Sequence, residues 1–157
     1  MRELNQDKNW RKIIGKKTFD RHQKDVELIL RIFAFGFFFD DYEKPMKEFL
    51  NRTMDREKKG NSNQVLALVK NFKIMAERIV SVLGERPFHL RGPLNSAALD
   101  SVFATLLRIK GAFPKDLSNR YTQLAKDTVF METTLHSTSD SSVIKKRFDV
   151  VREYLVG

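Results

Sequence analysis

The sequence predicts an all-α fold, a single helical domain of about seven helices over residues 1–157. Between Arg21 and Phe39, apolar residues recur at positions i, i+3, i+4 and i+7 and also fill the other faces, which is typical of a central helix covered on all sides. The same spacing continues for about six turns over residues 63–83. No stretch shows the sustained alternation of a β-strand, and no segment repeats at a fixed period.

The composition indicates one domain with a core of its own. The chain has 157 residues, 41% of them hydrophobic, and 13 phenylalanines, which is enough to fold without covalent cross-links. The absence of cysteine excludes disulfides and thiolate metal sites and fits a reducing compartment. The first residues lack the apolar core of a secretory signal. The central apolar block is too short to span a membrane, which takes about 20 consecutive apolar residues. We expect a cytoplasmic protein with no membrane partner.

The first three helices are set by local stop and start signals. The first is expected from about Asp7 to Ile14, with Gly15 ending it, and the central helix from about Lys24 to Phe39. Pro45 is tolerated at the first position of a helix, so the third is expected to run from Pro45 to about Arg56. The run REKKGNSN then breaks it.

The remaining elements follow from similar signals. Gly84 is expected to end the helix over residues 63–83, and Phe88 and Leu90 to pin the loop that follows to the core. Asn95 can cap a helix that extends to about Ile109. A shorter helix near residues 117–124, a short segment near 129–135 and a last helix from about Asp140 complete the chain.

The residues that commonly carry chemistry show no catalytic pattern. His22, His89 and His136 are far apart and lack ligand spacing, so no metal site is predicted. The pair at residues 40–41 is interpreted as turn-forming acids near a helix N-terminus in preference to catalytic carboxylates. The segment HSTSDSS is interpreted as a loop that ends in a helix cap. We therefore predict no catalytic residue, no cofactor and, for this chain alone, no enzyme activity.

The formal net charge of +9 raises the expectation of a polyanionic partner, DNA in particular. The excess is spread along the chain, and its densest run is Lys8, Arg11, Lys12, Lys16, Lys17, Arg21 and Lys24. Two interpretations compete. The favoured interpretation is a solvated helix face and loop, because only Trp10 and Phe19 are interleaved with these cations. The alternative is a phosphate-contacting patch.

Arg31 interrupts the apolar block and needs a partner, because an unpaired buried charge costs several kcal/mol. Glu27 lies four residues earlier, in the orientation that favours an ion pair on one helix. A structural ion pair between Glu27 and Arg31 is therefore predicted. The alternative is that Arg31 reaches a neighbouring segment or domain.

Several segments occur in a characteristic order. They are NWRKIIG, a basic linker, RHQKDVELILRIFAF, YEKPMKEFLNRTM, VLGERPFHLRGPLNSAALDSVFATLL and TSDSSVIKKRFDVVREYL. In this order they resemble the helical part of the GmrSD-type restriction protein family that follows its ParB-like nucleotidase or nuclease unit. The resemblance covers nearly the whole chain and depends on the order of the segments.

The resemblance implies a helical accessory domain of a DNA-restriction or antiphage defence protein, with the ParB-like unit as its partner. A full-length relative is expected to be a nucleotide-dependent nuclease. The family's DGQQR-type catalytic motif and HNH-type nuclease domain do not occur in this sequence, so no catalytic residue carries over. The matched positions are expected to pack, cap or dock: Arg21, Asp25, Glu27, Leu28, Arg31, Tyr42, Phe49, Leu50, Asn51, Phe88, Asn95 and Arg147.

Two functions are therefore predicted. The first is an accessory domain that docks the ParB-like unit through its first two helices, at Trp10, Ile13, Ile14 and Phe19. An apolar docking face of that kind tends to be covered by another molecule, so we also expect self-association as a symmetric homodimer. The alternative is a stand-alone nucleic-acid-binding module that uses the basic run from Lys8 to Lys24.

Overall fold

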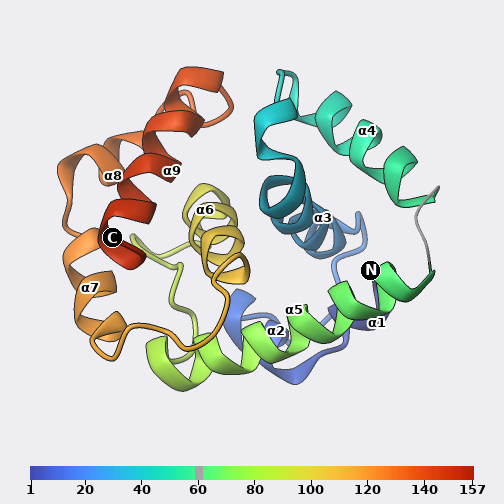
Figure 1. Ribbon diagram of the computed structural model, residues 1–157, viewed down its shortest axis with the longest axis horizontal. Coiled ribbons are helices and arrows are strands. Elements are labelled where there is room, and N and C mark those ends of the chain that lie inside the picture. Colours follow the sequence, from blue (N-terminus) through green and yellow to red (C-terminus); the bar gives the residue numbers. More distant parts are fainter. Residues whose placement is uncertain (59–61) are drawn as a thin grey trace.

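The computed structural model describes residues 1–58 and 62–157. These residues form helices and connecting loops but no strand, which confirms the all-α prediction (Figure 1). The nine α-helices of the described part are α1 (Arg2–Asn5), α2 (Lys8–Ile14), α3 (Lys24–Phe38), α4 (Met46–Lys58), α5 (Ser62–Leu83), α6 (Ser96–Leu107), α7 (Leu117–Leu124), α8 (Thr128–Thr133) and α9 (Ser141–Leu155), with a 3₁₀ turn η1 (Phe39–Asp41) between α3 and α4. Part of the expected break after α4, residues 59–61, lies outside the described residues.

The predicted number of about seven helices is too low, because two short helices escape a periodicity criterion. Helix α1 is a single turn, too short to show a repeat of apolar residues. The short segment expected near residues 129–135 is helix α8. Its start is fixed by Asp127, whose side chain accepts a hydrogen bond from the backbone N–H of Phe130 at 2.9 Å.

Local signals fix several helix ends as expected. Gly15 and Gly84 adopt φ of 68° and 83° directly after α2 and α5, a left-handed conformation that glycine adopts at little cost. The side chain of Asn95 accepts a hydrogen bond from the backbone N–H of Ala98 at 2.9 Å. Asn95 therefore caps α6, as predicted.

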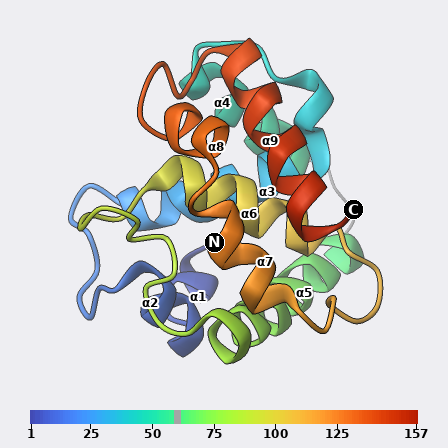
Figure 2. The ribbon, with the colours of Figure 1, turned by 90° about the vertical axis from the view of Figure 1, so that its left-hand side faces the viewer.

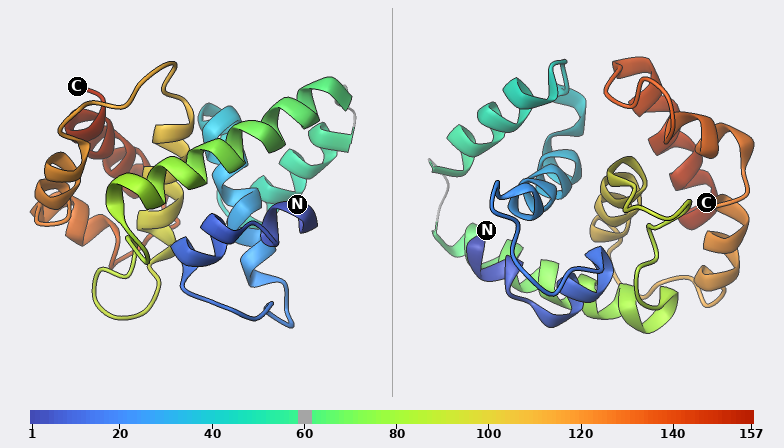
Figure 3. Two further views of the ribbon diagram at one scale, coloured as in Figure 1. Left: turned by 90° about the horizontal axis from the view of Figure 1, so that it is seen from below. Right: turned by 180° about the vertical axis from the view of Figure 1, so that it is seen from behind.

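Helices α3 and α6 lie side by side at the centre of the molecule (Figure 1). Helix α5 crosses both, as the left-hand view of Figure 3 shows, and α2 packs against α5. Helices α7, α8 and α9 form a group, with α9 packed on α6 (Figure 2). Segments far apart in the sequence therefore meet around α3 and α6.

The apolar side of α2 lies inside the core, so the predicted docking and dimer face is wrong. Trp10, Ile13 and Ile14 are all buried within their own chain. The Trp10 ring packs edge-on against Phe72 of α5 and Phe103 of α6, with ring centroids 5.6 and 6.3 Å apart. These side chains are covered because α5 and α6 pack over α2. Phe19, the fourth predicted docking residue, stays 60% exposed.

A second group of aromatic rings joins α3, α4 and α9. The ring of Phe35 lies 5.3 Å from the rings of both Phe49 and Phe148, measured between centroids. Phe39 and Tyr42 pack against the same cluster. This packing places α9 beside α3 and brings polar side chains from α3, α6 and α9 together.

Candidate functional site

A buried ion pair connects the two central helices. Nε and Nη2 of Arg31 on α3 donate to Oδ2 of Asp100 on α6, at 3.0 and 2.6 Å. Asp100 is fully buried, and 13% of the Arg31 side chain is exposed. Burial raises the pKa of Asp100, while the positive charges of Arg31 and Arg147 oppose that rise. The pair holds α3 against α6.

Arg147 of α9 completes this charged centre. It is fully buried, and its terminal nitrogens donate to the backbone carbonyl oxygens of Thr133 at 2.6 Å and Thr138 at 3.1 Å. Burial lowers the pKa of Arg147, and the carboxylate of Asp100 opposes this. Since neither Asp100 nor Arg147 has exposed area, neither can touch a ligand in this conformation. The centre therefore holds the fold together.

The predicted Glu27–Arg31 ion pair is wrong. Among the described residues, the ion-pair partner of Arg31 is Asp100, which is 69 positions away in the sequence. Glu27 is exposed on α3, where water already solvates its charge. Leaving the buried Asp100 carboxylate unpaired would cost more free energy than leaving Glu27 in water. The alternative that Arg31 reaches a neighbouring segment is therefore the correct one.

Arg11, a member of the predicted basic run, has a structural role. Its Nη1 donates to Oδ1 of Asn5 and Oδ2 of Asp25, at 3.0 and 2.9 Å, and its other nitrogens donate to the backbone carbonyl oxygens of Lys16 and Thr18. Burial alone would raise the pKa of Asp25, but hydrogen bonds from the side chains of Asn5 and Arg11 and from two backbone N–H groups hold that pKa below its ordinary value. Arg11 therefore fixes the connection between α2 and α3 and is not free to contact phosphate.

The other six cations of the run lie at the surface. Lys12 is 3.5 Å from a carboxylate oxygen of Glu85. The remaining five are exposed and form no ion pair with a described residue: Lys8, Lys16, Lys17, Arg21 and Lys24. Phe19 lies beside them, with its ring centroid 5.1 Å from the Arg11 guanidinium. A phosphate-contacting role for these five exposed side chains stays a prediction.

A different cationic surface lies between the end of α3, the second half of α5 and the segment after α6. It is a hollow of about 630 Å³, called the cationic hollow below. Three cations line it, Arg78, Arg108 and Lys110, and no aspartate or glutamate is among its described lining residues. None of the three forms an ion pair with a described residue. A smaller hollow of about 390 Å³ is also lined by residues 108–110, together with residues of α9.

Two contacts position the side chain of Arg78 in the cationic hollow. Its guanidinium lies 3.9 Å from the centroid of the Phe113 ring, and its Nη2 donates to the backbone carbonyl oxygen of Gly111 at 3.1 Å. A fixed guanidinium that lacks a carboxylate partner is well suited to an oxyanion such as phosphate. The cationic hollow is therefore our candidate functional site.

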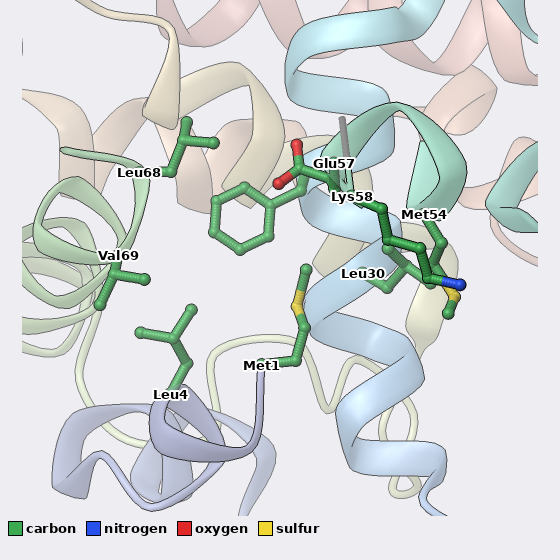
Figure 4. Close-up of a pocket in the computed structure, with 9 residues that line it drawn as sticks. Met1, Leu4, Leu30, Met54, Glu57, Lys58, Leu68 and Val69 are labelled. Carbon is green, nitrogen blue, oxygen red and sulfur yellow. The ribbon is translucent and has the colours of Figure 1, made fainter. Parts of the chain in front are cut away.

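An apolar hollow of about 290 Å³ lies between α1, α3, α4 and α5. Figure 4 shows Leu4, Leu68 and Val69 on one side of it and Leu30 and Met54 on the other, with the Met1 side chain between them. Glu57 and Lys58 are its charged lining residues. Its other lining residues offer contact to an apolar side chain.

The described ranges contain neither a metal-binding cluster nor a membrane-spanning helix. Within them, no three or more His, Cys, Asp or Glu side chains lie close enough together to hold a metal ion. Every helix in residues 1–58 and 62–157 is too short or too polar to span a bilayer.

Several residues that carry the family resemblance serve the fold. The Asn95 side chain donates to the backbone carbonyl oxygen of Thr134 at 2.9 Å, in addition to capping α6. The Tyr42 hydroxyl donates to the backbone carbonyl oxygen of Ser139 at 2.5 Å, and Phe88 lies fully inside the core. Comparisons with protein-family models, with curated proteins and with solved structures found no match. The resemblance therefore stands on these residues and their order alone.

The linear pattern of charge does not predict the cationic hollow, although one signal points to it. Residues 101–115 include Arg108, Lys110 and Lys115 but no acidic residue. That imbalance is smaller than the one in the amino-terminal run, and Arg78 comes from another helix, so only the fold brings the cations together.

Proposed function

We propose that this chain is a non-catalytic helical module that binds nucleic acid through the cationic hollow. The observation that carries this proposal is the convergence of Arg78, Arg108 and Lys110 without an acidic neighbour in the described lining. Lysine and arginine that neutralise phosphates release the counterions condensed on a nucleic acid, which supplies most of the affinity of non-specific binding. The net charge of +9 adds long-range attraction for the same partner.

The cationic hollow is a better site for phosphate than the run from Lys8 to Lys24. In the hollow, Arg78 is already ordered by Phe113 and Gly111, so less side-chain entropy is lost when an anion binds. In the amino-terminal run, by contrast, Arg11 is occupied by Asn5 and Asp25.

We further propose that the module is an accessory domain of cytoplasmic DNA-restriction or antiphage defence machinery that works with a ParB-like unit. The family resemblance supports this role, and some of its matched residues, such as Phe88 and Asn95, pack or cap within the fold. Any catalysis would then belong to the partner. The chain would contribute by positioning nucleic acid.

One observation favours docking as a second function. The apolar hollow of Figure 4 is flanked by Met1 and Met54, which are both exposed. Methionine adapts its shape to a partner surface, and exposed apolar groups gain free energy when a partner covers them. Met54→Lys is expected to abolish co-purification with a ParB-like unit, whereas unchanged co-purification would exclude this surface.

Nucleic-acid binding can be tested by fluorescence anisotropy with a short labelled DNA oligonucleotide. The test variant is Arg108→Glu with Lys110→Glu, and the matched control is Lys16→Glu with Lys17→Glu. All four residues are exposed, and both variants change the net charge equally, so long-range attraction falls by the same amount. We expect the test variant to lose binding and the control to retain most of it. An equal loss, or a larger loss in the control, would show that the hollow is not the site.

A further inference from the structure

We infer that the cationic hollow takes single-stranded nucleic acid and stacks a base on the ring of Phe37. This inference rests on the proposed function and specifies the form of nucleic acid that the site recognises. It comes from the position of one aromatic ring among the three cations of the hollow.

Phe37 is an exposed aromatic residue at the end of a buried helix. On α3 its neighbours Phe33 and Phe35 are buried, whereas Phe37 is 46% exposed and lines the cationic hollow. Its ring is stacked on that of Phe33, with centroids 6.2 Å apart and 18° between the ring planes. Because Phe33 is itself fixed by contact with Phe72, the orientation of the Phe37 ring is set before any ligand arrives.

The hollow also offers apolar surface next to its charges. Ile74 of α5 is exposed and lines the same hollow as Phe37. The volume of the hollow, about 630 Å³, is in the range of sites that bind a small molecule. The hollow therefore has room for a nucleotide. A base placed against Phe37 would put its phosphates within the region of Arg78, Arg108 and Lys110.

This combination favours a single strand over a duplex. In a duplex the faces of each base are covered by the neighbouring bases, so an aromatic side chain cannot stack on them without separating the pairs. A single strand presents its base faces, and aromatic stacking beside a cationic groove is the common way to bind it without sequence preference. Of the two forms of nucleic acid, only the single strand can therefore cover the face of the Phe37 ring.

The test compares three labelled probes of equal length: oligothymidylate, an abasic strand with the same phosphodiester backbone, and a blunt DNA duplex. Wild type is expected to bind oligothymidylate more tightly than either of the others. Phe37→Ala should weaken oligothymidylate binding roughly 5- to 100-fold, the usual effect of removing one stacking aromatic, and leave the affinity for the abasic strand unchanged. Phe19→Ala is the control, since it removes an exposed phenylalanine outside the hollow.

The abasic strand separates this inference from the proposed function. If wild type binds oligothymidylate and the abasic strand equally, or prefers the duplex, stacking on Phe37 is excluded while binding of polyanions stands. If none of the three probes binds at low salt, both proposals fail. Should Phe37→Ala lower binding of the abasic strand as well, Phe37→Leu decides, because leucine fills the hollow without a ring. If Phe37→Leu binds oligothymidylate as tightly as the wild type does, the inference is overturned.

Discussion

Replacing Arg31 with methionine should destabilise the chain by about 3 to 5 kcal/mol, the usual cost of removing one partner of a buried ion pair. Arg31 donates twice to Oδ2 of Asp100, at 3.0 and 2.6 Å. Methionine fills similar space but leaves a fully buried carboxylate without its counter-ion. For a chain of this size, that loss corresponds to a fall in Tm of roughly 6 to 20 °C. Urea denaturation at neutral pH, followed by circular dichroism, measures it.

Arg56→Met is a matched control for this prediction. The Arg56–Asp41 pair has the same N–O distance of 2.6 Å, but 47% and 52% of its side chains are exposed. An exposed pair of this kind contributes about 1 kcal/mol or less. If burial sets the cost, Arg31→Met must lose several times more stability than Arg56→Met. Equal losses would refute the reasoning that Asp100 depends on Arg31.

Three further outcomes are expected. Phe33→Ala should cost about 3 to 5 kcal/mol because Phe33 is buried against Phe72; a Tm within about 2 °C of wild type would contradict its core position. Asp25→Asn should flatten the acid side of the stability curve. The lowered pKa of Asp25 contributes stability that is complete above about pH 4 and is lost as the pH falls through its folded pKa; identical wild-type and variant slopes over that range would exclude this role. The purified chain should neither hydrolyse nucleoside triphosphates nor cut DNA, with or without Mg²⁺ or Mn²⁺. Turnover that survives repurification and disappears in a point variant of the chain would overturn this expectation.

Features that depend on neighbouring residues could be predicted from the sequence. The spacing of apolar residues located α3 and α5, and Gly15, Gly84 and Asn95 marked helix ends correctly. These signals act within a few residues of the position that they determine, so one sequence is enough to detect them. A helix of one turn, such as α1, is too short to give such a signal.

Features that depend on tertiary packing could not be predicted in the same way. The local rule for ion pairs favoured Glu27 as the partner of Arg31, whereas the fold supplies Asp100 from α6. The docking role predicted for Trp10 was wrong because α5 and α6 cover its side chain. The cationic hollow combines residues from α3, α5 and the segment after α6, so the linear density of charge pointed to the amino-terminal run instead.

The salt dependence of binding tests most directly whether phosphates bind in the cationic hollow. Each phosphate neutralised on a single strand adds about −0.7 to the slope of log K against log salt concentration, so three cations predict a slope of roughly −2 or steeper. Arg108→Gln with Lys110→Gln should make the slope less steep by about 1.4, while Lys16→Gln with Lys17→Gln should leave it unchanged. A slope that is unaffected by the first variant and reduced by the second would place the phosphates on the amino-terminal run and contradict the proposed site.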